Sequence, residues 1–213
     1  MILRATLAFV VTPLASGLFA QCPERDSLEY LNTIRSSTIK YEVMSLIPWV
    51  WEYEGKEQKP LMNRIQGLAL SDDEVRFEGR GVRVQISQQP FDSLKAKIGY
   101  GSTDSYRFVC AINGAPFWGT DGDRPTRMLS GLSVTIDGGM VEIPRRAWSD
   151  LYQPNLCFVD GNGKPYCDCV VARSADNKRV YVHMSNSDGA GGYTVTWIFI
   201  NGRYVRRVLE GPP

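Results

Sequence analysis

The residue types closest to chemistry lie near the C-terminus, in the glycine-rich segment SNSDGAGG at residues 185–192. A phosphate-binding loop converges backbone N–H groups on an anion and places that anion at the start of a helix. Here the next residues are YTVTWIFI, which are β-branched and aromatic, and no Lys-Ser or Lys-Thr pair follows the glycines. The segment therefore predicts a bend between two strands. Asp188 is its only charge, and it is a candidate ligand contact because loops at the end of a sheet often carry function.

His183 is the single histidine of the chain, and it alternates with Tyr181 on one face of a predicted strand. A catalytic histidine needs a nucleophile beside it, and no GxSxG nucleophile elbow is present. We therefore expect a structural role for His183 and keep it as a candidate ligand contact, with no residue assigned as catalytic.

The segment WGTDGDRPTR contains the acidic pair with the best spacing, Asp121 and Asp123. Calcium needs six or more oxygen ligands, often from acids at every second position of a loop. The segment DGNGKP begins such a pattern and breaks at Lys164. Turn chemistry explains these residues better, so no metal or other cofactor is predicted. Trp118 stands beside the turn residues, and we expect it to be exposed and to contact a ligand together with Asp121 and Asp123.

Aromatic residues alternate along PWVWEYEG, where Trp49, Trp51 and Tyr53 share one face of a predicted strand. Such a stripe can form a flat platform for sugar rings. It is more often the inner face of a sandwich, because aromatic side chains bury the largest areas. We favour the core interpretation.

All five cysteines lie beyond residue 21, in a segment expected to reach an oxidising compartment, which favours disulfides. The segment CFVDGNGKPYCDC predicts a hairpin that places Cys157 opposite Cys167. We expect Cys110 to pair with Cys169, which leaves Cys22 free or acylated. A zinc site needs four convergent ligands, and one histidine without CxxC pairs does not supply them.

Residues 1–20 are typical of a secretory signal peptide, with Arg4 before an apolar run and small residues after it, and cleavage within residues 17–21. The expected location is therefore secreted or periplasmic. A lipid anchor at Cys22 is disfavoured because Gln21 is not small. No other run approaches the roughly 18 apolar residues of a membrane span.

Residues 22–40 are predicted to form a helical segment ahead of a single β domain at residues 41–213. Asp26 and Glu29 have capping-box spacing, and Leu28, Leu31 and Ile34 recur every three residues. These features predict one amphipathic helix that lies against the main body.

The rest of the chain has the period of two that is typical of strands. The dipeptides Asn113-Gly114, Asp137-Gly138 and Asn201-Gly202 each separate apolar segments and favour type I′ hairpin turns, as does the Gly79-Arg80-Gly81 turn. The fold class predicted is mainly β, an antiparallel β-sandwich or barrel-like fold built from hairpins. One further short helix is expected in PRRAWSDLY, opened by Pro144.

The last hairpin has the most definite register. With Asn201-Gly202 as its turn, Phe199 should face Tyr204 and Trp197 should face Arg206. The other expected pairs are Ile198–Val205, Thr196–Arg207 and Val195–Val208. Both strand faces are mixed in polarity, so we expect both to be partly covered.

Removal of the signal peptide would take away Arg4 and no acid, which leaves equal numbers of cations and anions. Nucleic-acid binding and binding to acidic membranes then lose their electrostatic basis. The sequence therefore favours an exported, disulfide-linked binding or interaction module for a protein or carbohydrate partner rather than an enzyme. The alternatives are a secreted or periplasmic hydrolase acting on polysaccharide or peptide, and an envelope-associated structural protein.

Overall fold

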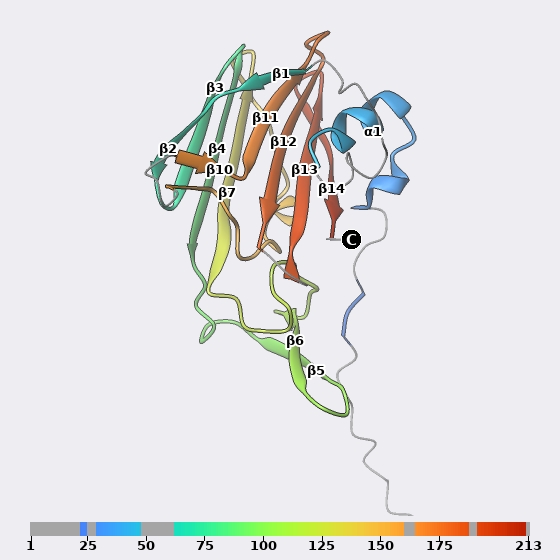
Figure 1. The fold of residues 1–213 in the computed structure, drawn as a ribbon, viewed down its shortest axis with the longest axis vertical. Helices are drawn as coiled ribbons and strands as arrows, with labels where there is room; N and C mark the ends of the chain where they lie inside the picture. The colour runs from blue at the N-terminus through green and yellow to red at the C-terminus, as the bar shows by residue number, and fades with distance from the viewer. Residues whose placement is uncertain (1–21, 25–28, 48–61, 160–164, 188–190, 212–213) are drawn as a thin grey trace, which may run out of the picture.

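The computed structural model describes residues 22–24, 29–47, 62–159, 165–187 and 191–211. The expected signal segment, the aromatic stripe at Trp49, Trp51 and Tyr53, and Asp188 lie outside the described residues. Within the described part, the chain is mainly β and antiparallel, as predicted, and two five-stranded sheets pack as a sandwich (Figure 1).

The first sheet has the strand order β1-β11-β12-β13-β14. Its strands are β1 (Met62–Ile65), β11 (Cys169–Ser174), β12 (Arg179–Asn186), β13 (Tyr193–Ile200) and β14 (Arg203–Glu210). Strand β13 is buried on both faces, because Val195, Trp197 and Phe199 enter the main core while Ile198 packs on the opposite side. The expectation that both faces are covered is confirmed for this strand.

The second sheet has the order β2-β3-β4-β7-β8 and supplies the other half of the main core. Its strands are β2 (Gly67–Ser71), β3 (Glu74–Gly79), β4 (Val82–Pro90), β7 (Arg127–Ile136) and β8 (Gly139–Met140). The inward residues alternate as the period of two requires, for example Val82, Val84 and Ile86 on β4.

Two small hairpins complete the described β structure. One pairs β5 (Ile98–Ser102) with β6 (Arg107–Ile112) and projects from one end of the sandwich (Figure 1). The other pairs β9 (Cys157–Val159) with β10 (Pro165–Cys167). The projecting hairpin belongs to a separate apolar cluster that contains Val109 and Phe117.

The predicted tight turns have the backbone that their sequences favour. Both residues have positive φ in Arg80-Gly81, Asp137-Gly138 and Asn201-Gly202, which join β3 to β4, β7 to β8 and β13 to β14. Asn113-Gly114 also turns this way, but only an isolated bridge follows between Ile112 and Ala115. The residue after Ala115 is Pro116, which has no backbone N–H, so no second strand continues there.

The N-terminal helix begins later than the sequence predicted. Leu31–Thr33 form a single 3₁₀ turn, η2, and the α-helix α1 spans Ser37–Met44, beyond the expected end at residue 40. Ser36 caps α1 by accepting a hydrogen bond from the Ile39 N–H. The Leu31 N–H donates instead to the Glu210 carboxylate on β14. Contacts with the sheet edge thus replace helical hydrogen bonds in this segment.

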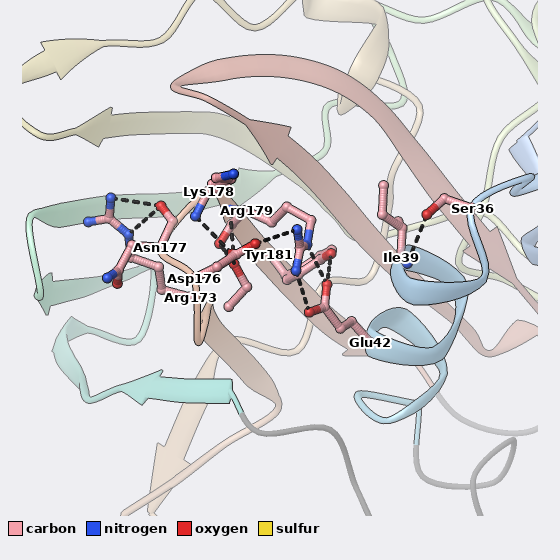
Figure 2. Close-up of polar contacts among 10 residues, drawn as sticks. Ser36, Ile39, Glu42, Arg173, Asp176, Asn177, Lys178, Arg179 and Tyr181 are labelled. Carbon is pink, nitrogen blue, oxygen red and sulfur yellow. Dashed lines mark hydrogen bonds and ion pairs between the residues drawn. The ribbon is translucent and has the colours of Figure 1, made fainter.

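A buried ion pair attaches α1 to the outer face of the first sheet. Figure 2 shows Glu42 of α1 directed at Arg179 and Tyr181 of β12. Arg179 donates two hydrogen bonds to the Glu42 carboxylate, at 2.7 and 2.9 Å, and the Tyr181 hydroxyl donates a further one. Arg179 also contacts Asp176 at 3.0 Å. The network fixes the position of α1 because its charged groups are paired where they are buried.

The predicted short helix at PRRAWSDLY is a single 3₁₀ turn, η3 (Arg145–Ala147), after Pro144. The Trp197 indole N–H donates to the Ala147 carbonyl oxygen at 2.7 Å. This bond holds η3 against the inner face of β13. Among the described residues, no helix is long and apolar enough to cross a membrane.

The disulfide prediction is confirmed for Cys157–Cys167, which are direct partners across β9 and β10. The predicted Cys110–Cys169 pair is wrong, because Cys110 bonds to Cys22. Cys169 is a free thiol that faces the main core and is 4% exposed. Cys110 lies on the projecting hairpin and Cys169 in the sandwich core, which explains the difference. Cys22 is therefore neither free nor acylated in this structure.

The register of the last hairpin is confirmed only next to its turn. Phe199 faces Tyr204, but Val205 is an extra residue in a β-bulge. Beyond it Ile198 faces Arg206, Trp197 faces Arg207, Thr196 faces Val208 and Val195 faces Leu209, so the other four expected pairs are wrong by one residue. The bulge turns Leu209 into the main core and places Val208 against the helix side. It also turns Arg207 inward.

Candidate functional site

The tryptophan predicted to be an exposed ligand contact is buried. Trp118 is 6% exposed, which corrects the expectation, because a bridge to Leu151 draws its segment into the main core. Its ring lies 6.4 Å from that of Tyr30 and 6.0 Å from that of Tyr193. Trp118 nevertheless lines a cavity, so it still can contact a ligand from one edge.

The two candidate aspartates, Asp121 and Asp123, are exposed in the loop that follows Trp118. The Thr120 hydroxyl donates to the Asp123 carbonyl oxygen at 2.8 Å, which is ordinary turn chemistry. In the part of the chain that the structure describes, no group of three or more His, Cys, Asp or Glu side chains is placed to hold a metal.

The glycine-rich loop meets this aspartate loop through its backbone. A Cβ atom on Gly191 would lie 2.5 Å from the Thr120 carbonyl carbon and 2.7 Å from the Asp121 N. Glycine is therefore needed at position 191, because two backbone segments approach each other closely there. The loop joins strands β12 and β13, as predicted, and these two strands pair with each other.

His183 lies inside the first sheet, on the opposite face of β12 from the main core. Its Nδ1 is 2.9 Å from the Thr196 hydroxyl oxygen, and its Nε2 has no partner among the described residues. Burial, with a smaller contribution from Arg64, lowers the pKa of His183 to about 3. The imidazole is neutral at pH 7. The structure thus does not bring His183 together with Trp118 or the aspartates.

A different set of residues encloses a cavity at the edge of the first sheet. We call it the β14-edge cavity; it has a volume of about 740 Å³. The N-terminal segment, the chain around Trp118, the η3 region and β14 enclose it. Its described charged residues are four arginines and two acids: Glu29, Arg35, Arg146, Asp150, Arg206 and Arg207.

Arg207 forms the floor of the cavity, with its side chain 5% exposed. It donates to both Glu29 carboxylate oxygens at 2.8 Å and to both Asp150 oxygens at 2.5 and 2.7 Å. Burial alone would lower the pKa of Arg207, but these hydrogen bonds outweigh it and raise the pKa. One guanidinium group therefore joins the N-terminal segment, the η3 region and β14.

The rim of the cavity is cationic. Arg35 and Arg146 are exposed, and neither has an ion-pair partner in the described ranges. Arg206 donates to the Thr33 hydroxyl at 2.7 Å. Arg207 is occupied by two acids, so Arg35 and Arg146 are the cavity cations for which the described residues offer no ion-pair partner. Tyr204 adds a half-buried phenol whose pKa burial raises to about 12, so it stays neutral.

Sequence reasoning missed this site because its residues come from four distant segments. In the sequence, the pair Arg206-Arg207 is only a short basic run, too small to bind nucleic acid. A usable signal was the mixed polarity of both faces of β14. Adjacent strand residues face opposite sides, so one of the two arginines must face the core, and the bulge makes that residue Arg207.

Comparison of the chain with protein-family models, with curated protein sequences and with solved structures finds no match. The geometry of the β14-edge cavity is therefore the basis for a functional proposal.

Proposed function

We propose that the protein is an exported, disulfide-linked β-sandwich module that binds a small anionic ligand in the β14-edge cavity. The observation that carries this proposal is the presence of Arg35 and Arg146, without acidic partners in the described structure, on the rim of the cavity. Guanidinium groups bind carboxylate or sulfate groups by paired, charge-assisted hydrogen bonds.

The size and lining of the cavity support a small ligand. A volume of about 740 Å³ lies in the range typical of small-molecule sites. Trp118 and Tyr204 supply aromatic surface beside the arginines, so the cavity combines a few convergent charges with apolar contact. A flat protein surface that binds nucleic acid lacks both the enclosed volume and this combination of convergent charges with apolar contact.

The disulfides support the expected export. The structure contains two disulfides, Cys22–Cys110 and Cys157–Cys167. Disulfides are stable in an oxidising compartment and are rare in a reducing cytosol. Together with the signal-like N-terminus, they favour a secreted or periplasmic location.

A glycoside hydrolase is the enzymatic alternative, because Glu29 and Asp150 both line the cavity. Such an enzyme needs one protonated carboxyl group that donates to the leaving oxygen. In both Glu29 and Asp150, each carboxylate oxygen accepts a hydrogen bond from Arg207. Neither acid is therefore presented as a proton donor, and binding is the better supported function.

The test is titration calorimetry with a panel of mono- and dicarboxylates, uronic acids and sulfated sugars. Arg35→Gln and Arg146→Gln should each weaken the best binder about tenfold or more, since a hydrogen bond to a charged group contributes about 1.5–3 kcal/mol. Arg203→Gln is the matched control, because Arg203 is exposed on the same hairpin and does not line the cavity. The proposal fails if no anion binds, or if both rim variants bind like the unchanged protein.

A further inference from the structure

A second depression adjoins the β14-edge cavity on the helix side of β14. We call it the aliphatic groove; its volume is about 280 Å³. Its apolar lining comes from the N-terminal segment, α1 and the last hairpin, and consists of Ile34, Ile39, Ile198, Ile200 and Val205. An apolar groove of this size between a helix and a sheet edge suits a hydrocarbon group better than a polar one.

The groove and the cavity share one wall. Both are lined by Thr33 and Arg35 of the N-terminal segment and by Val205 and Arg206 of β14. The same two arginines thus border a charged space on one side and an aliphatic space on the other. A ligand whose anionic group is held by Arg35 therefore lies next to the groove.

The bulge residue Val205 supports the use of this surface. Val205 is 51% exposed, and it is the one described large exposed hydrophobic residue that lines either depression. The bulge adds this residue between Tyr204 and Arg206, at the point where the two depressions meet. Bulges are common beside binding sites, where they redirect side chains.

We propose that the anionic ligand is an amphiphile: a carboxylate with an unbranched alkyl chain, whose head occupies the β14-edge cavity and whose chain lies in the aliphatic groove. This inference rests on the proposed function and specifies its ligand class. Charge complementarity places the head at Arg35 and Arg146, and the wall that both depressions share places the chain over Val205.

The energetic consequence is a dependence of affinity on chain length. Each methylene group buried in an apolar site contributes about 0.8 kcal/mol, which is about fourfold in affinity. Affinity should therefore rise by about this factor per methylene along a series of alkanoates and then level off, because a groove of about 280 Å³ holds a limited chain.

The experiment measures binding of butanoate to dodecanoate to the full chain by calorimetry, below the micelle concentration of each acid. Val205→Asn should flatten the dependence on chain length, because it places a polar group in the groove. Leu94→Asn is the matched control, since Leu94 is exposed at a position outside both depressions. Arg146→Gln, which lines only the cavity, should lower affinity for every chain length by a similar factor and leave the slope unchanged.

The outcomes separate the two proposals. Short carboxylates that bind with no gain from longer chains would overturn the amphiphile inference and leave anion binding intact. An unchanged slope in Val205→Asn would overturn the location of the chain. Absence of binding by every carboxylate and sulfate tested would overturn the proposed function itself.

Discussion

The buried imidazole of His183 makes the folding stability of the protein depend on pH near neutrality. Its side chain is 2% exposed, its pKa is about 3 in the folded state, and the ordinary value is 6.5. Between these two values the unfolded chain binds a proton that the folded chain excludes. The stability that depends on a neutral His183 is therefore fully present above pH 6.5, and it is lost progressively as the pH falls from 6.5 toward 3.

The size of this effect follows from the two pKa values. Each pH unit by which the pH falls within this window lowers the free energy of unfolding by about 1.4 kcal/mol. Integrated from pH 7 to pH 5, protonation of the unfolded state should lower the free energy of unfolding by about 2 kcal/mol. Carboxylates with low pKa values, such as Asp176 at about 2, change stability only at lower pH. Burial raises the pKa of Glu210, so a variant without the histidine is needed to separate the two groups.

Urea unfolding monitored by tryptophan fluorescence at pH 7 and pH 5 measures the difference. The control is His183→Asn, which retains a hydrogen-bonding atom near the Thr196 hydroxyl and does not titrate. The variant is expected to be less stable at both pH values because a smaller side chain leaves a void. Its loss of stability between pH 7 and pH 5 should be smaller than that of the unchanged protein by about 2 kcal/mol.

The reasoning is refuted if both proteins lose the same stability over this interval. That result would mean that His183 is protonated in the folded state with nearly its ordinary pKa, and hence that water or an acid reaches its Nε2.

Three further predictions concern the core, the helix and one turn. Thiol titration should find no reactive cysteine in the native protein and one, Cys169, after unfolding without reductant; two or more would refute the disulfide assignment. Glu42→Gln should lower the free energy of unfolding by about 3 kcal/mol, measured in urea, because it leaves Arg179 partly buried without its main partner. Gly119→Ala should lower the melting temperature far more than Gly138→Ala. Both glycines have positive φ, but only at Gly119 would the new Cβ meet a backbone carbonyl. Equal changes in melting temperature would contradict this.

The fold class was predictable because its signals are local. Dipeptides such as Asp137-Gly138 and Asn201-Gly202 favour the positive φ angles that tight turns require, and both form the predicted turns. Alternation of apolar residues identifies the strands between them. The Cys157–Cys167 bond followed from the same local register.

The candidate site was not predictable because it depends on contacts between distant segments and on one irregularity. Nothing in the residues around Arg207 indicates that Glu29 and Asp150 will meet it. The one-residue bulge at Val205 reverses which arginine faces inward, and strand alternation alone cannot reveal it. Trp118 is buried for a similar reason, since its bridge to Leu151 is non-local.

The arrangement around Arg207 has a consequence for folding during synthesis. The segment that carries Glu29 and Leu31 finds its partners on β14, 178 and 179 positions later in the chain. A growing polypeptide therefore carries this early segment without its native contacts until the last strand of the sheet has left the ribosome. Native closure of the early segment therefore follows the synthesis of β14, and a chain truncated before β14 should expose that segment to proteases even where other hairpins have formed.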